Sequence, residues 1–195
     1  MGQDSDATQL VTALIGAGVD THHFERVAPP TGRAFISLTP DGESSIIVLP
    51  LASHEIDPDY VCRSLDELKP TAVLSQLETP SSVTTAIATW CARSNVRFIL
   101  NASSVQELPQ FVAELADPLI VNAGEARAIL GTAFVDDDDE RTLAASLAKL
   151  ARSVVLTAGP RGAFIAQRDV VDHVARSQQR SKTQPVQATL SPERF

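Results

Sequence analysis

Residues 71–100 read TAVLSQLETPSSVTTAIATWCARSNVRFIL, and this stretch decides the class of fold. An apolar run at Ala72–Leu77 precedes a helical stretch at Ser81–Ala92, and a second apolar run follows at Val96–Leu100. Apolar runs of this length, rich in β-branched and aromatic residues, are typical of buried strands. A strand, a helix and a strand in this order predict two parallel strands joined by a right-handed crossover.

The same alternation continues toward the C-terminus. Helices are expected at Pro109–Leu115, Glu125–Leu130 and Arg141–Leu150, and strands at Leu119–Val121, Val154–Thr157, Ala163–Gln167 and Val170–Val174. Repeated strand and helix units predict an α/β fold with a Rossmann-like, layered parallel sheet. Thr79 and Pro80 predict the start of the first crossover helix, with Thr79 as N-cap and Pro80 as first helical residue.

The N-terminal part of the chain has a different pattern. Apolar residues recur at helical spacing within Ala7–Ile15, and the glycines at positions 16 and 18 supply a helix stop. Two β-rich runs follow, at Ala34–Leu38 and Ser45–Leu49, and Pro40-Asp41-Gly42-Glu43 joins them. An Asp-Gly pair is typical of hairpin turns. The sequence therefore predicts a small two-stranded flap at about 33–49, separate from the main sheet.

Composition excludes several classes of function. The chain has 195 residues, 44% of them hydrophobic, and a net charge of -8. That length favours one globular core, and the surplus of carboxylates argues against a nucleic-acid partner. No apolar stretch is long enough to span a bilayer, so no membrane partner is expected. Cys62 and Cys91 lack metal or redox spacing, which predicts free thiols in a cytoplasmic protein.

Glu78 is the first candidate for chemistry. It directly follows the apolar run that ends at Leu77, which places a carboxylate at the carboxyl end of a predicted strand. Open α/β sheets bind ligands at that edge. The alternative is a solvated acid that stabilises the dipole of the following helix. Both interpretations remain open from the residues alone.

Asn122-Ala123-Gly124-Glu125 lies where a strand gives way to a helix. Asn and Glu at this spacing are typical of a capping box, in which each side chain bonds the other residue's amide. They also supply oxygen atoms of the kind that Mg²⁺ prefers. The four residues alone favour the cap.

Thr157-Ala158-Gly159-Pro160-Arg161-Gly162 lies between two predicted strands. Glycines at such a turn permit a ligand to approach the main chain closely. The alternative is an ordinary tight connection, because Gly-Pro segments are common in turns.

Taken together, these segments resemble the ribokinase-like (pfkB) carbohydrate kinase family. The resemblance covers residues 1–175, which are interpreted as a partial domain of that family. Six ordered motifs carry it: Gly2-Gln3-Asp4, Gly18-Val19-Asp20-Thr21, Thr31-Gly32-Arg33-Ala34 with Asp41-Gly42-Glu43, Leu77-Glu78-Thr79-Pro80, Asn122-x-x-Glu125 and Thr157-x-Gly159-x-x-Gly162.

The resemblance implies an ATP-dependent kinase that transfers a phosphoryl group to a sugar hydroxyl, with ribose favoured. It implies that Glu78 binds the sugar and that the hairpin is a lid, which also offers a homodimer contact. It further implies a nucleotide and Mg²⁺-phosphate site, with Glu125 acting on the metal through water. The residues implied at that site are Asn122, Glu125, Thr157, Gly159 and Gly162.

Two segments depart from the family pattern. Asn101-Ala102-Ser103-Ser104 stands where many relatives have Asn-Pro-Ala-Pro, and Leu51-Ala52-Ser53 stands where they have Gly-Ala-Asn. The second departure weakens the expected link between lid and sugar.

The last residues point to a change of reading frame. Codons that join the third base of one residue to the first two of the next let Lys182–Phe195 encode DTTGAGDAFTGAF. That string resembles the C-terminal signature of the family, which supplies the catalytic Asp and an anion hole. Residues 176–195 are therefore expected to be a frameshifted, disordered tail.

The chain also begins at the family's Gly-x-Asp point, so a fold truncated at both ends and catalytically incomplete is predicted. The alternative function is a non-catalytic sugar-binding or dimerising module.

Overall fold

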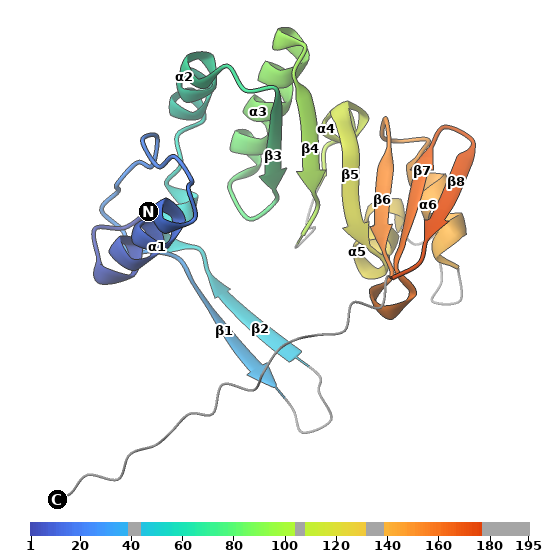
Figure 1. Ribbon diagram of the computed structural model, residues 1–195, viewed down its shortest axis with the longest axis horizontal. Coiled ribbons are helices and arrows are strands. Elements are labelled where there is room, and N and C mark those ends of the chain that lie inside the picture. Colours follow the sequence, from blue (N-terminus) through green and yellow to red (C-terminus); the bar gives the residue numbers. More distant parts are fainter. Residues whose placement is uncertain (39–43, 104–107, 132–138, 177–195) are drawn as a thin grey trace, which may run out of the picture.

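The computed structural model describes residues 1–38, 44–103, 108–131 and 139–176, and its centre is a six-stranded sheet (Figure 1). The strands follow one another in sequence order. The first four pair in parallel, the fifth pairs antiparallel with the fourth, and the sixth pairs antiparallel with the fifth. The predicted α/β class is confirmed, and parallel pairing holds for four of the strands. The strands are β3 (Ala72–Gln76), β4 (Arg97–Asn101), β5 (Ala116–Asn122), β6 (Val154–Thr157), β7 (Ala163–Gln167) and β8 (Val170–Val174).

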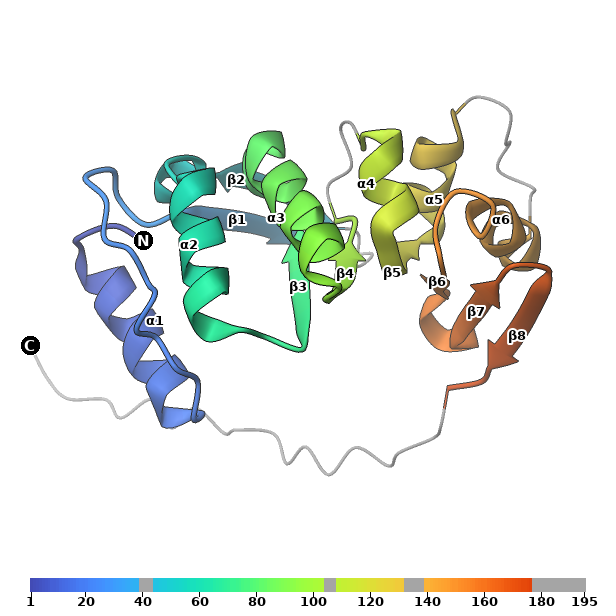
Figure 2. The ribbon, with the colours of Figure 1, turned by 90° about the horizontal axis from the view of Figure 1, so that it is seen from above.

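Four helices cover one side of this sheet (Figure 2). They are α3 (Ser81–Ser94), α4 (Gln110–Leu115), α5 (Ala123–Leu130) and α6 (Glu140–Leu147). Alternate strand residues point to this side and are almost completely buried. They include Phe98, Leu100, Leu119, Val121, Val154 and Leu156. The core of the protein therefore lies between the sheet and a single layer of helices.

The N-terminal part contributes α1 (Ser5–Gly16) and an antiparallel hairpin of β1 (Arg33–Leu38) and β2 (Ser44–Leu49). The predicted flap at 33–49 is confirmed, although its Asp41-Gly42 turn lies outside the described residues. The hairpin projects beyond the carboxyl ends of the parallel strands (Figure 1). No helix in the described ranges is both long and apolar enough to cross a membrane.

The sequence patterns did not reveal α2 (Pro58–Leu68), which follows a short 3₁₀ turn at Leu51–His54. The sequence does carry a signal for the start of this helix, because Asp57 caps the helix and Pro58 is its first residue. The helix packs on α3, and the Trp90 indole donates a hydrogen bond of 2.7 Å to the Asp66 carboxylate.

The predicted start of α3 was wrong by one residue. Pro80 is the N-cap, with an extended ψ of 140°, and the helix begins at Ser81. Thr79 therefore lies too early to cap the helix, and its hydroxyl oxygen is buried without a hydrogen-bond partner among the described residues. Proline at the N-cap supplies no side-chain acceptor, so the first turn is held by the Val83 amide, which bonds the Pro80 carbonyl.

A carboxylate fastens the first helix to the chain that enters the hairpin. Asp4 caps α1 by accepting the Ala7 amide at 3.0 Å, and it accepts the Thr31 amide at 2.8 Å and the Thr31 hydroxyl at 2.7 Å. The Gly2 amide donates to the same hydroxyl. A Cβ on Gly2 would lie 2.5 Å from the Thr31 nitrogen, so only glycine fits beside this contact. The Gly2-Gln3-Asp4 motif and the motif that begins at Thr31 are thus held together by these hydrogen bonds, which we call the Asp4 joint.

The Asp4 joint predicts a specific dependence of stability on pH. The Thr31 hydroxyl, helped by the Ala7 and Thr31 amides, lowers the pKa of Asp4 from 3.8 to about 2. Because the folded-state pKa is depressed, the stabilisation is complete above about pH 4 and is lost as pH falls toward 2. Asp4→Asn should lower the free energy of unfolding at pH 7 and flatten this pH dependence, as measured by urea denaturation.

Asp172→Asn is the control, because this carboxylate is exposed and makes no comparable contacts with the residues that the structure describes. An unchanged slope between pH 4 and pH 2 in the Asp4 variant would contradict the assignment.

Candidate active site

The candidate residues gather at the edge where the parallel strands end. Gln76 pairs with Asn101 across β3 and β4, and Asn122 pairs with Thr157 across β5 and β6. Glu78 and Ser103 follow the first two of these strands directly. Since the carboxyl ends of parallel strands share one edge, residues as far apart in sequence as Glu78 and Thr157 lie along it.

Glu78 lies beside a cavity beneath the base of the hairpin. The cavity has a volume of about 380 Å³, and its lining combines hairpin residues such as Gly32 and Leu49 with Ser53 and Glu78. The Glu78 carboxylate is exposed and accepts a hydrogen bond of 3.3 Å from the Ser103 hydroxyl. The carboxylate therefore borders a space that hydroxylated ligands could enter.

Ser103 is a site residue that the sequence did not reveal. It belongs to the Asn101–Ser104 stretch, which was recognised only as a departure from the family pattern. Its hydroxyl meets Glu78 because β3 and β4 are adjacent, and no local pattern encodes a contact across 25 residues. Ser104 itself lies outside the described residues.

Asn122 and Glu125 form the predicted capping box. The Asn122 side chain accepts the Glu125 amide at 2.8 Å, and the Glu125 carboxylate accepts the Asn122 amide at 2.7 Å. This confirms the structural interpretation of the four residues. The cap occupies only the Oε2 atom of Glu125. The carboxylate keeps further acceptor sites for water or a ligand.

Thr157 begins a tight turn beside this cap. Its hydroxyl donates to the Val121 carbonyl at 3.3 Å, which ties the end of β6 to the end of β5. The Ala158 amide then bonds the Gly162 carbonyl at 2.8 Å and closes the turn. Both glycines have positive φ, +55° at Gly159 and +94° at Gly162, which explains the residue type.

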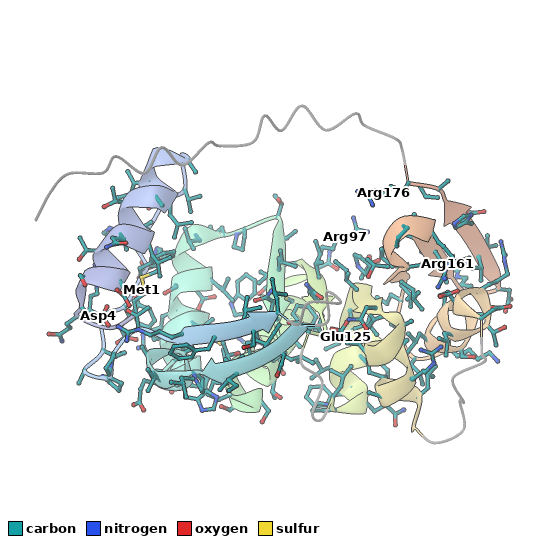
Figure 3. The ribbon with its side chains drawn as sticks, turned by 90° about the horizontal axis from the view of Figure 1, so that it is seen from below. Met1, Asp4, Arg97, Glu125, Arg161 and Arg176 are labelled. Carbon is teal, nitrogen blue, oxygen red and sulfur yellow. The ribbon has the colours of Figure 1, made fainter. Side chains whose placement is uncertain are left out.

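Arg161, on the outer side of the turn, holds it against two other elements. Its guanidinium pairs with the Glu140 carboxylate at the start of α6. Its carbonyl lies 2.7 Å from the His173 Nε2 atom on β8. Figure 3 shows Arg161 on the turn and Glu125 at the start of α5.

The edge therefore carries two groups of polar residues with β4 between them. Glu78 and Ser103 form the first group, and the second contains Asn122, Glu125 and the Thr157 turn. With a spacing of about 4.8 Å between strands, β3 and β5 lie about 10 Å apart. Viewed from this edge, the hairpin lies at the β3 end of the sheet (Figure 3). This arrangement suits a ligand, or two ligands, with distinct polar ends.

Comparison with known proteins assigns the chain to a family. The sequence profile of the pfkB family carbohydrate kinases matches residues 1–189. The chain belongs to the pfkB carbohydrate kinase family. It is 28% identical to ribokinase of Bacillus subtilis (strain 168) over 164 residues, which are 83% of this chain and 53% of that one. The chain spans about half the length of the curated relatives that it matches.

Solved structures agree with the fold. Ribokinase from Thermotoga maritima matches with a TM-score of 0.78 at 24% identity, over 92% of this chain and 59% of that chain. Ribokinase of Arabidopsis thaliana, solved in complex with ribose and ATP, matches with a TM-score of 0.74 at 23% identity, over 90% and 59%. The fold is thus ribokinase-like, with the sheet and the hairpin as predicted.

Gly162 should tolerate no side chain. A Cβ there would lie 2.0 Å from the Val174 carbonyl oxygen, and backbone cannot yield as a flexible side chain does. Gly162→Ala should therefore lower the free energy of unfolding by more than the roughly 1–3 kcal/mol that an unfavourable φ costs. Chemical denaturation measures the change.

Gly131→Ala is a matched control for Gly162→Ala. Gly131 has a similar backbone conformation, with φ of 76°, but no atom of the described residues lies within 4 Å of its would-be Cβ. Equal losses of stability in the two variants would show that the contact with Val174 contributes nothing.

Proposed function

We propose that this chain carries the sugar-binding and nucleotide-binding part of a cytoplasmic, ATP-dependent sugar kinase, with ribose as the favoured acceptor. The observation that supports it best is the division of one sheet edge into the Glu78 group under the hairpin and the Asn122–Thr157 group beyond β4. A sugar and the phosphates of ATP would occupy these two places. The Arabidopsis thaliana ribokinase, which resembles this chain in fold, was solved with ribose and ATP.

Glu78 would bind the sugar. Its carboxylate can accept hydrogen bonds from sugar hydroxyls, and Ser103 fixes one of its oxygens at 3.3 Å. Hydrogen bonds to a charged acceptor are stronger than those between neutral groups. The cavity under the hairpin gives the ring a place beside Glu78.

Glu125 and Asn122 would organise the hydrated Mg²⁺ and the phosphates, with Thr157, Gly159 and Gly162 bordering the nucleotide. The residues fit the group, because carboxylate and amide oxygens suit a hard cation that retains water. The positive end of the α5 dipole at this point also favours phosphate. When bound, Mg²⁺ would neutralise charge on the phosphoryl oxygens.

Residues 1–195 would bind these ligands without turning them over. Residues 182–195 contain no Gly-Ala-Gly-Asp string, whereas the same codons read in the shifted frame can encode one. A general base contributes roughly 10² to 10⁴ in rate, and one oxyanion donor contributes roughly 10² to 10³. We therefore interpret residues 1–175 as the partial kinase domain and 176–195 as a tail outside it.

Calorimetric titration of the full chain tests the two ligand assignments. Glu78→Gln should weaken ribose binding about tenfold and leave Mg²⁺-ADP affinity unchanged, because it removes one charged acceptor. Glu125→Gln should do the opposite. Each variant is the control for the other, since both neutralise an exposed or half-exposed carboxylate at the same edge.

Two results would contradict the proposal. The absence of heat with both ligands would remove the binding assignment. Ribose-dependent consumption of ATP by purified residues 1–195 would show that the chain is catalytically complete.

A dimerising module is the second candidate, because the hairpin exposes large apolar side chains. Ile36 is 63% exposed, Leu38 73% and Ile47 64%. Exposed apolar patches on this scale mark interaction surfaces.

If the hairpin pairs two copies of the chain, Ile36→Asp should convert a dimer to a monomer in sedimentation velocity, since burial of an unpaired charge is costly. Leu74→Asp, at a comparably exposed position on β3, should leave the dimer intact. A chain that is monomeric before substitution would dismiss this role.

A further inference from the structure

A cavity lies at the edge of the sheet opposite the candidate site, and we call it the amino-edge cavity. It has a volume of about 340 Å³, and its walls include the starts of β4 and β5 and the last turns of α3 and α4. Figure 1 shows these strand starts at the end of the sheet away from the hairpin. The five residues of β4 rise about 3.3 Å each, so the two edges lie about 16 Å apart. A ligand in this cavity would be distinct from the sugar and the nucleotide.

One wall of the amino-edge cavity carries two arginines and one aspartate. The Arg97 Nε atom donates to the Asp117 carbonyl at 2.9 Å and lies 3.4 Å from the Asp117 carboxylate. The Ser153 hydroxyl donates to the same carboxylate. This hydroxyl, helped by Arg97, lowers the pKa of Asp117, so the carboxylate is charged at neutral pH. Two guanidinium groups against one carboxylate leave one positive charge in the wall, in a chain whose net charge is -8.

Arg152 supplies the charge that is not neutralised. Its backbone amide donates to the Ala116 carbonyl at 3.1 Å, which fixes the residue just before β6. Its guanidinium donates no hydrogen bond within the described part of the chain, because Arg97 and Ser153 already engage Asp117. A guanidinium presents its N–H donors as a planar fork that matches an oxyanion. The fork of Arg152 is therefore available to a ligand in the cavity.

The opposite wall is apolar. Phe98 is 2% exposed, Cys91 is 1% exposed, and Leu115 is half-buried. Burial raises the pKa of the Cys91 thiol to about 11, so this thiol is neutral at pH 7 and is neither a nucleophile nor a metal ligand. Cys91 thus contributes a small hydrophobic surface. A wall of this kind suits a ligand with a hydrocarbon or aromatic body.

The end of α3 opposes an anion only weakly. A helix C-terminus carries roughly half a negative charge on its last carbonyls. Here the Asn95 and Val96 amides both donate to the Cys91 carbonyl, and Arg93 lies in the last turn of the helix. The arginines therefore set the sign of the potential in the cavity.

We propose that the amino-edge cavity binds a small oxyanion attached to an apolar body, either a carboxylate or a phosphate monoester. Arg152 and Arg97 would hold the oxyanion, and Phe98 and Leu115 would contact the body. Hydrogen bonds from a charged planar fork are stronger and more directional than those from neutral donors. The site does not depend on the proposed sugar and nucleotide sites, and its test uses neither ribose nor nucleotide. Failure of this proposal would leave the proposed kinase function untouched.

The probes are phenyl phosphate and benzoate, titrated at constant ionic strength into ¹⁵N-labelled residues 1–195 and followed by NMR. We expect saturable chemical-shift changes centred on the amides of residues 91–98, 115–117 and 152. Inorganic phosphate should bind about tenfold more weakly than phenyl phosphate, because it lacks the apolar body. The tighter of the two probes would tell whether the site takes a phosphate or a carboxylate.

Arg152→Gln should weaken both probes about tenfold or more, because it removes the charged fork. The fold should persist, since no described side chain bonds this guanidinium. Arg152→Lys keeps the charge without the fork and should give an intermediate affinity. Arg168→Gln is the matched control, because it removes the same charge from an exposed residue between β7 and β8.

Three outcomes would overturn the proposal. One is the absence of saturation with both probes. Another is equal weakening by Arg152→Gln and Arg168→Gln, which would reveal only a general attraction to positive charge. The third is a set of shifts centred on the Asn122–Thr157 group, which would place the probes at the other edge of the sheet.

Discussion

The parallel hydrogen-bonded ladder of β3 to β6 is the constraint on which the rest of the structure depends. Because the four strands run the same way, Glu78, Ser103, Asn122 and Thr157 all emerge at one edge, even though the register of β4 and β5 shifts between Phe98 and Leu100. These residues are far apart in sequence, and only the strands that carry them bring them to the same edge. The sheet therefore positions the candidate site, and local motifs such as the capping box set only the conformation at the strand ends.

The same ladder also decides which strand side chains enter the core. Alternation along each strand sends Phe98, Leu100 and Leu119 into the layer of helices and sends Ile99 and Ile120 the other way. One backbone arrangement thus sets both the core and the edge that carries the candidate site. The hairpin is independent of the ladder, and the Asp4–Thr31 joint anchors it to α1 instead.

Local chemistry made part of this structure predictable. The spacing of Asn122 and Glu125 encodes a capping box within four residues, and the apolar runs encode the strands. Contacts between distant residues were beyond such patterns, as the Glu78–Ser103 hydrogen bond shows. Pro80 misled the prediction of the helix start because proline is typical of the first helical position, whereas here its ψ of 140° makes it the N-cap. Binding roles for Glu78 and Glu125 depend on ligands, which side-chain spacing cannot specify.

The tight contact at Gly162 has a consequence for the path of the chain. The same would-be Cβ that meets Val174 lies 2.9 Å from the Arg176 nitrogen, so the chain leaving β8 passes directly over the turn at Gly159–Gly162. A group a few residues beyond such an exit searches only a small volume, because a short tether gives a millimolar effective concentration. Residues that directly follow Arg176 therefore begin their path beside this turn.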